Sequence, residues 1–148
     1  MRRLQSLVAP LAALALAALW ATGCSVIRSD PAKATRQYPF WLKPGETIDA
    51  QAIADGDTMV IVNATPRTFE NVDVWLNQRY LCHVDRIEAG ENKRIPMGDF
   101  WDIRGEGPNP GGALRYFQPT PIRLVELQLD ATQPLIGLQA VLTEVETR

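Results

Sequence analysis

The sequence is poor in the residue types that hydrolytic and metal-dependent active sites use. Its 148 residues include two cysteines, Cys24 and Cys82, and a single histidine, His83. After residue 24, serine occurs only at positions 25 and 29. A Ser–His–Asp arrangement within the following domain is therefore excluded, and no CxxC or HxxxH spacing suits a zinc site. We expect a protein that is not an enzyme, with no catalytic residue, no metal and no cofactor.

Positive charge is also scarce. The chain has 15 basic and 17 acidic residues, a net charge of −2. Removal of the first 23 residues, which include Arg2 and Arg3, leaves 13 basic residues and a net charge of −4. A mildly acidic domain is not suited to neutralising phosphates, so nucleic acid is not an expected partner. Nor does it have the polybasic face that draws proteins to anionic lipid, so membrane attachment would have to be covalent.

The N-terminus has the composition of an export signal. Arg2 and Arg3 precede an apolar run from Leu4 to Trp20, interrupted only by Gln5 and Ser6. This run is short for a membrane span and typical of the apolar region of a signal peptide. A signal-peptide helix over residues 1–23 is therefore expected.

The segment Ala21-Thr22-Gly23-Cys24 resembles the lipobox of bacterial lipoproteins, although Leu is usual where Ala21 stands. The resemblance implies cleavage between Gly23 and Cys24, a diacylglyceryl group on the Cys24 sulfur and acylation of the new amine. Two or three acyl chains anchor a protein stably. Ser25 after the cysteine implies, by similarity to known sorting rules, the outer membrane, with the protein facing the periplasm. An ordinary secretory signal or an uncleaved helix is the alternative.

Residues 24–45 are expected to form a lipidated tether. Residues 25–38 are polar and not periodic, so they predict a linker with a reach of roughly 50 Å. The aromatic cluster from Tyr38 to Leu42 has three readings: it dips into the membrane interface, docks a partner, or is pinned across the domain core.

Residues 46–148 show strand-like alternation and turn signals instead of helical periodicity. Strands are expected over residues 47–53, 58–63, 71–76, 80–84, 93–97, 122–129 and 137–145. Such a pattern predicts an all-β fold, an immunoglobulin-like β-sandwich of about seven strands. A small β-barrel is the alternative.

Three segments within residues 57–102 resemble bacterial immunoglobulin-like domains of the FxLYD type. They are the strand Val60-Ile61-Val62-Asn63, the alternating Asn71-Val72-Asp73-Val74, and the turn Ala89-Gly90-Glu91 with Ile95 beyond it. The Phe-x-Leu-Tyr-Asp signature itself is absent. The resemblance implies a binding or structural module of the cell envelope and carries over no catalytic residue.

Two groups of residues could carry chemistry. Cys82 and His83 are neighbours, but adjacent side chains of a strand point to opposite faces, so a buried, inert Cys82 is expected. There are two aspartate pairs, Asp55 with Asp57 and Asp99 with Asp102. Such pairs suggest calcium binding or glycoside hydrolysis, and ordinary turns are the simpler interpretation.

Aromatic residues give the binding hypothesis. If Val72, Val74 and Leu76 face the core, Trp75 and Asn77 face outward; in the other register Trp75 is a core residue. We predict a binding surface made of Trp75, Asn77 and Trp101.

The expected function is therefore a lipid-anchored envelope protein whose module binds a protein partner, with β-augmentation at a sheet edge as one mode. The alternative is a glycan or small-ligand binder that uses Trp75 or Trp101 with the loop 103–121.

Overall fold

The computed structural model describes residues 28–110 and 118–141. The predicted signal peptide and Cys24 lie outside the described residues, as does part of the 103–121 loop. Two short 3-10 helices and seven strands follow one another along the chain: η1 Pro31–Lys33, β1 Pro44–Asp55, β2 Thr58–Asn63, β3 Phe69–Leu76, β4 Tyr80–Ile87, β5 Asn92–Pro96, η2 Met97–Asp99, β6 Val125–Gln128 and β7 Leu135–Val141.

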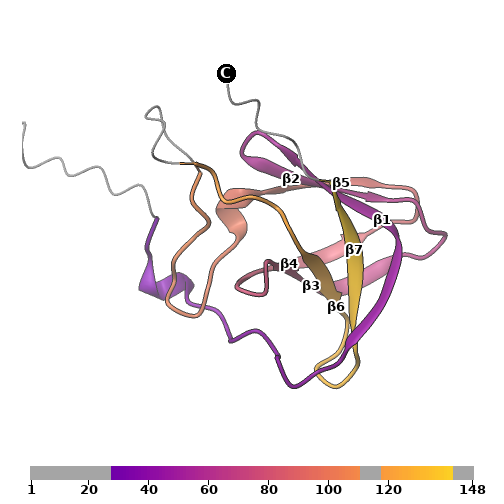
Figure 1. The fold of residues 1–148 in the computed structure, drawn as a ribbon, viewed down its shortest axis with the longest axis horizontal. Coiled ribbons are helices and arrows are strands. Elements are labelled where there is room, and N and C mark those ends of the chain that lie inside the picture. Colours follow the sequence, from indigo (N-terminus) through magenta and orange to yellow (C-terminus); the bar gives the residue numbers. More distant parts are fainter. Residues whose placement is uncertain (1–27, 111–117, 142–148) are drawn as a thin grey trace, which may run out of the picture.

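The seven strands form one mixed sheet in the order β4-β3-β6-β7-β1-β2-β5. Neighbouring strands are antiparallel except β1 and β7, which are parallel. The halves β4-β3-β6 and β7-β1-β2-β5 enclose the core, and pairing of β6 with β7 joins them into a nearly closed, barrel-like sheet (Figure 1). The prediction of an all-β fold with about seven strands is confirmed. Strand β1 spans Pro44–Asp55 and is longer than the predicted strand 47–53. Strand β6 spans Val125–Gln128 and is shorter than the predicted strand 122–129.

The register of β3 follows the apolar alternation of the sequence. Val72, Val74 and Leu76 are fully buried on the inner face, where they pack with residues of the other strands such as Met59 and Ile61. This is the first of the two registers considered for this strand. Trp75 therefore points to the outer face of the sheet, as do Asp73 and Leu81 across β3 and β4.

Around Trp75 the outer face is nevertheless closed to solvent, because residues 36–42 run across it. Tyr38 packs edge-to-face on Trp75, with ring centroids 5.2 Å apart, and both join Leu81 and Leu135 in a second apolar cluster. The Trp75 side chain is 0% exposed. The prediction that Trp75 contributes to a binding surface is therefore wrong, since the N-terminal segment covers the face on which it lies.

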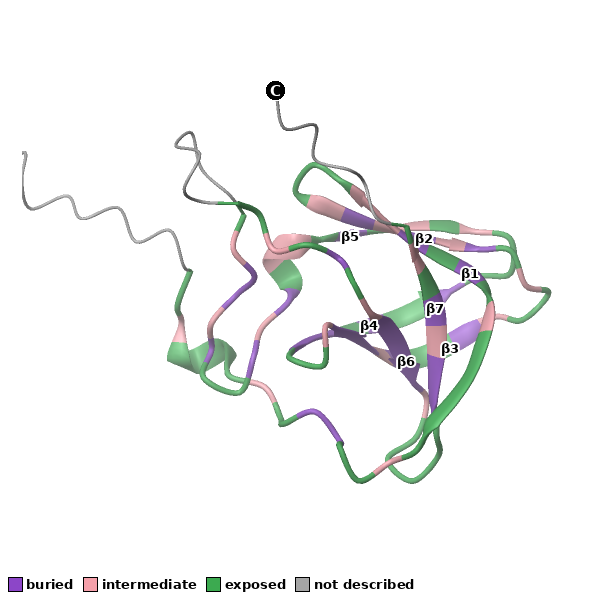
Figure 2. Cartoon of the chain, viewed as in Figure 1, coloured by how far each residue is buried: buried purple, intermediate pink, exposed green. Residues whose placement is uncertain are grey.

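The same covering explains strand β6, whose four residues are all buried (Figure 2). Its polar side chains Glu126 and Gln128 lie on the covered outer face. The Tyr38 hydroxyl donates to Glu126 Oε2 at 2.7 Å, and Trp75 Nε1 donates to Gln128 Oε1 at 2.9 Å. Both buried polar groups are thus satisfied, as burial requires.

Residues 28–38 do not form the linker predicted from their composition. The backbone amide of Asp30 donates to Gly105 O at 2.8 Å, and that of Thr35 donates to Asp102 O at 3.0 Å. The linker interpretation of these residues is wrong because their polar backbone pairs with the 101–107 loop instead of with water. The described part of the predicted tether is an integral part of the domain.

We predict that Trp75→Ala lowers the free energy of unfolding by about 3–5 kcal/mol, since it removes a large buried side chain from between Tyr38 and the sheet. Trp75→Phe keeps most of the packing and loses the bond to Gln128, at a cost of about 1 kcal/mol. Urea unfolding monitored by circular dichroism measures both. The exposed Trp41 provides the control, because Trp41→Ala should change stability by less than about 0.5 kcal/mol. Equal effects of the two alanine substitutions would contradict the covered face.

Candidate functional site

The segment 38–42, which we call the aromatic turn, holds two large side chains in solvent. Phe40 is 64% exposed and Trp41 is 72% exposed. The residues on either side are anchored: Tyr38 is buried, and Leu42 packs against the second apolar cluster. The Phe40 amide donates to Tyr38 O and the Leu42 amide donates to Pro39 O, which closes the turn. The turn therefore presents its aromatic pair on a fixed backbone.

Beside Trp41 lies a set of linked polar side chains, Arg36, Asp73, His83 and Gln128, which we call the polar shelf. Asp73 accepts from Arg36 through Oδ2, and its Oδ1 lies 2.7 Å from His83 Nδ1. Arg36 also donates to Gln128 Oε1 at 2.9 Å and stacks over the Trp75 ring. Strands β3, β4 and β6 place these groups side by side, because Asp73 pairs with His83 on one side and with Gln128 on the other.

The aromatic turn separates two depressions of the surface. Trp41 borders the first, of about 490 Å³, whose floor includes the polar shelf. Phe40 borders the second, of about 280 Å³, together with Ile103 and Arg104. The two exposed rings therefore belong to different surroundings, although they are neighbours in the sequence.

The other predicted surface residues have structural roles. Trp101 is half-buried, and the Arg28 guanidinium lies over its ring, 4.3 Å from the centroid. The side-chain Nδ2 of Asn77 donates to Pro121 O, and its Oδ1 accepts from the backbone amides of Arg123 and Leu124. Asn77 thus holds the start of β6 in place. The prediction that these side chains form one binding surface with Trp75 is not what the structure shows.

Cys82 and His83 do not form a catalytic pair. Cys82 is buried, whereas the exposed His83 ring contacts Asp73. Burial, together with the negative charges of Asp99 and Asp73, raises the pKa of the Cys82 thiol to about 12. A thiol of this kind is almost entirely protonated at neutral pH and is a poor nucleophile.

Three of the four aspartates in the predicted pairs are engaged by protein groups. Asp55 pairs with Arg94 at 2.8 Å, and Asp57 accepts from the Thr58 hydroxyl. Asp102 is nearly fully buried and pairs with Arg79 at 2.8 Å. Over residues 28–110 and 118–141, no three His, Cys, Asp or Glu side chains gather in a way that would hold a metal ion.

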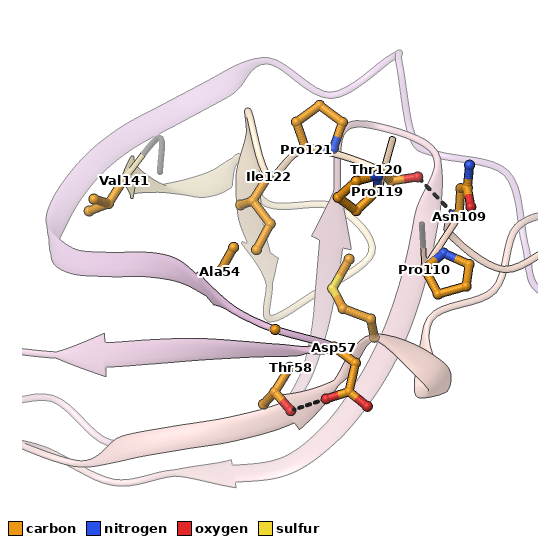
Figure 3. Close-up of a pocket in the computed structure, with 12 residues that line it drawn as sticks. Ala54, Asp57, Thr58, Asn109, Pro110, Pro119, Thr120, Pro121, Ile122 and Val141 are labelled. Carbon is orange, nitrogen blue, oxygen red and sulfur yellow. Dashed lines mark hydrogen bonds between the residues drawn. The ribbon is translucent and has the colours of Figure 1, made fainter. Parts of the chain in front are cut away.

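A smaller, apolar pocket of about 110 Å³ lies at the C-terminal ends of β1 and β7 (Figure 3). Ala54, Ile122 and Val141 line one side, and Pro110 with Thr120 lines the other. The Thr120 hydroxyl accepts from the Asn109 amide at 2.8 Å, which ties the two loop segments together. The pocket has room for only a few apolar atoms, and the carboxylate at its rim, Asp57, is already hydrogen-bonded. This pocket suits packing better than recognition of a polar ligand.

In the part of the chain that the structure describes, no helix has the length and apolar character needed to cross a membrane. Comparison of the chain with protein-family models, with curated proteins and with solved structures finds no match. The interpretation of the site therefore depends on its own geometry.

We predict that Cys82 is unreactive in the folded protein, because its thiol is buried and its pKa is about 12. In a Cys24→Ala background, an aromatic disulfide reagent at pH 8 should modify Cys82 slowly in buffer and at once in concentrated urea. A cysteine introduced at the exposed Ala89 should react at once in both. Fast modification of Cys82 without urea would contradict its burial.

Proposed function

We propose that this chain is a non-catalytic, lipid-anchored protein of the bacterial cell envelope that binds a protein partner. The anchor is inferred from the signal-peptide pattern and the lipobox-like Ala21-Thr22-Gly23-Cys24. The described residues begin at Arg28, four positions after that cysteine in the sequence, and residues 28–110 and 118–141 form one folded unit. Retention at the outer membrane, facing the periplasm, is the location that Ser25 favours.

The observation that carries the binding proposal is the exposure of Trp41 on a fixed turn. Tryptophan is enriched among the residues that dominate interface energies, above all where it is held rigidly. Ordering the Trp41 backbone costs little on binding, because Tyr38 and Leu42 already anchor it. The polar shelf beside it offers charged groups that would set the orientation of a partner.

A protein partner fits the shelf better than a glycan does. Both carboxylate oxygens of Asp73 are already engaged, one by Arg36 and one by His83. A sugar site needs polar groups that are free to take up hydroxyl groups, whereas a protein interface tolerates a pre-paired network at its rim. A glycan remains the second candidate, because an exposed tryptophan beside a polar depression is also suited to stacking on a sugar ring.

The absence of catalysis is part of the proposal. It is supported by the raised pKa of the buried Cys82 thiol and by the location of Cys82 and His83 on opposite faces of β4. Serine, the other common nucleophile, occurs after residue 24 only at positions 25 and 29. Among the groups considered, none combines an activated nucleophile with a positioned base.

We predict that Cys24→Ala abolishes lipidation and releases the protein from the membrane. The wild-type product should have the mass of a chain that begins at Cys24 plus a diacylglyceryl and an acyl group, and should enter the detergent phase in a partitioning assay. The variant should remain in the aqueous phase, because no thiol is left to carry the lipid. A wild-type product that begins at Met1, or has a bare thiol at position 24, would contradict the anchor.

We predict that Trp41→Ala weakens partner binding about 30-fold or more, which corresponds to the roughly 2 kcal/mol of an interface hot spot. The partner is first captured in cells by a photo-crosslinking amino acid in place of the exposed Ala131, which lines the same depression as Trp41. Its affinity for the purified domain is then measured by calorimetry. Phe40→Ala is the matched control, since Phe40 is similarly exposed but borders the other depression, and it should change affinity less than about threefold.

Crosslinking and the affinity of Trp41→Ala together distinguish a protein partner from a glycan. Crosslinking to one protein in stoichiometric yield, with loss of affinity in Trp41→Ala, supports the protein partner. Absence of a crosslinked protein, with calorimetric binding of envelope glycans that Trp41→Ala removes, would replace it with the glycan candidate.

A further inference from the structure

Arg28 is clamped to the domain only four residues after the proposed lipid-bearing cysteine. Its guanidinium lies over the Trp101 ring and donates to Gly98 O at 2.6 Å. Its carbonyl accepts from the Gly107 amide at 2.9 Å. A Cβ on Gly107 would lie 2.7 Å from the guanidinium, so a glycine there leaves room for the side chain. Aromatic, carbonyl and glycine contacts together fix this residue.

The clamp sets how far the domain can stand from the bilayer. With Arg28 fixed, four residue steps separate its Cα atom from that of Cys24, a reach of roughly 14 Å at full extension. A free linker over residues 25–38 would have reached roughly 50 Å. Since the acylated cysteine lies at the membrane surface, the side of the domain around Arg28 must lie close to the lipid headgroups.

A rigid turn with an exposed apolar tip lies on this side. Residues 102–105 form a turn in which the Gly105 amide donates to Asp102 O, and the Asp30 amide donates in turn to Gly105 O. Ile103 at its tip is 54% exposed, and Arg104 beside it is exposed as well. Gly105 has a positive φ of 74°, and a Cβ there would meet Asp30 O at 2.1 Å.

Asp102 holds this turn in shape from within. Its carboxylate accepts from the amides of Arg104 and Glu106, each at 2.8 Å, and from Arg79. Burial alone would raise the pKa of Asp102, but these donors lower it below its usual value. The carboxylate therefore stays ionised and the turn stays fixed at neutral pH.

The charges of this side suit a lipid surface, although the domain as a whole is acidic. Residues 28–43 contain four basic side chains and one acidic one, Asp30. The Asp30 carboxylate accepts from the Ala32 amide, and Glu106 pairs with Arg79. Of these acidic groups, Glu106 is paired with a base and Asp30 is hydrogen-bonded to a backbone amide, while Arg36 is the one of the four basic residues that pairs with Asp73. The exposed Arg104 adds a positive charge at the tip of the turn, beside an apolar side chain.

We propose that the turn at Ile103 and Arg104, with Phe40 across the depression that they share, is the surface that rests on the bilayer. Ile103 and Phe40 contact the interfacial region, and Arg104 contacts lipid phosphates. The proposal rests on the lipidation of Cys24 proposed above. It assigns the two rings of the aromatic turn to different ligands: Phe40 faces the membrane and Trp41 faces the partner.

The test uses the full lipidated protein in vesicles of phosphatidylethanolamine and phosphatidylglycerol, with no other protein present. Ile103→Cys and, separately, Ala89→Cys are labelled with an environment-sensitive fluorophore. Ala89 lies in the β4–β5 turn, on the side of the domain away from residues 28–35 (Figure 1). Buried Cys82 and acylated Cys24 do not compete for the label.

Lipids with a spin label near the headgroup should quench the probe at position 103 roughly twofold more than the probe at position 89. Insertion of twenty Gly and Ser residues between Cys24 and Arg28 lowers the effective concentration of the turn at the bilayer roughly tenfold, so this difference should shrink. Circular dichroism verifies folding of each variant, and Arg104→Cys provides a second position for the label.

The outcomes distinguish this inference from the proposed function. Equal quenching at positions 103 and 89 in a protein whose mass proves lipidation would overturn the bilayer-facing turn and leave the anchor standing. Unchanged quenching after the spacer insertion would overturn the role of the Arg28 clamp. A product without lipid would instead remove the proposed function itself.

Discussion

The structure depends on the docking of the N-terminal segment across the outer face of β3 and β6. This face has both a large apolar side chain, Trp75, and two polar ones, Glu126 and Gln128, so it is stable only when something covers it with matching groups. Tyr38 supplies a ring for Trp75 and a hydroxyl for Glu126. Without this cover, a carboxylate and an indole would share an open face of the sheet. With it, the β3–β6 region becomes a layered core.

The same docking creates the surfaces on which function is proposed. Because Tyr38 and Leu42 are anchored, the turn between them must project outward, and Phe40 and Trp41 occupy the projection. Because Arg36 lies over Trp75, its guanidinium reaches Asp73 and Gln128 and completes the polar shelf. One packing event therefore positions the residues that border both depressions.

Much of the fold was readable from the sequence, and the site was less so. The apolar run in residues 58–63 and the alternation in residues 71–76 predicted two strands correctly. The alternation did not decide which face of β3 points inward, because both registers fit the same period of two. Neither register predicted that Trp75 would be buried on the outer face, since periodicity reports the face of a strand and not what covers that face. Residues 28–38 have no apolar pattern, and their docking uses backbone hydrogen bonds that composition does not reveal. The pairing of Asp73 with His83 needed the β3–β4 register.

Burial of Cys82 would matter if the protein is exported to an oxidising compartment, as proposed above. A lone accessible thiol there is exposed to oxidoreductases and forms mixed disulfides or covalent dimers. Here one sulfur is proposed to be consumed by a thioether to lipid, and the other is buried in the core on the inner face of the edge strand β4. The folded chain would then offer no sulfur for exchange, so its maturation would require acyl transfer and proteolysis but no disulfide isomerase.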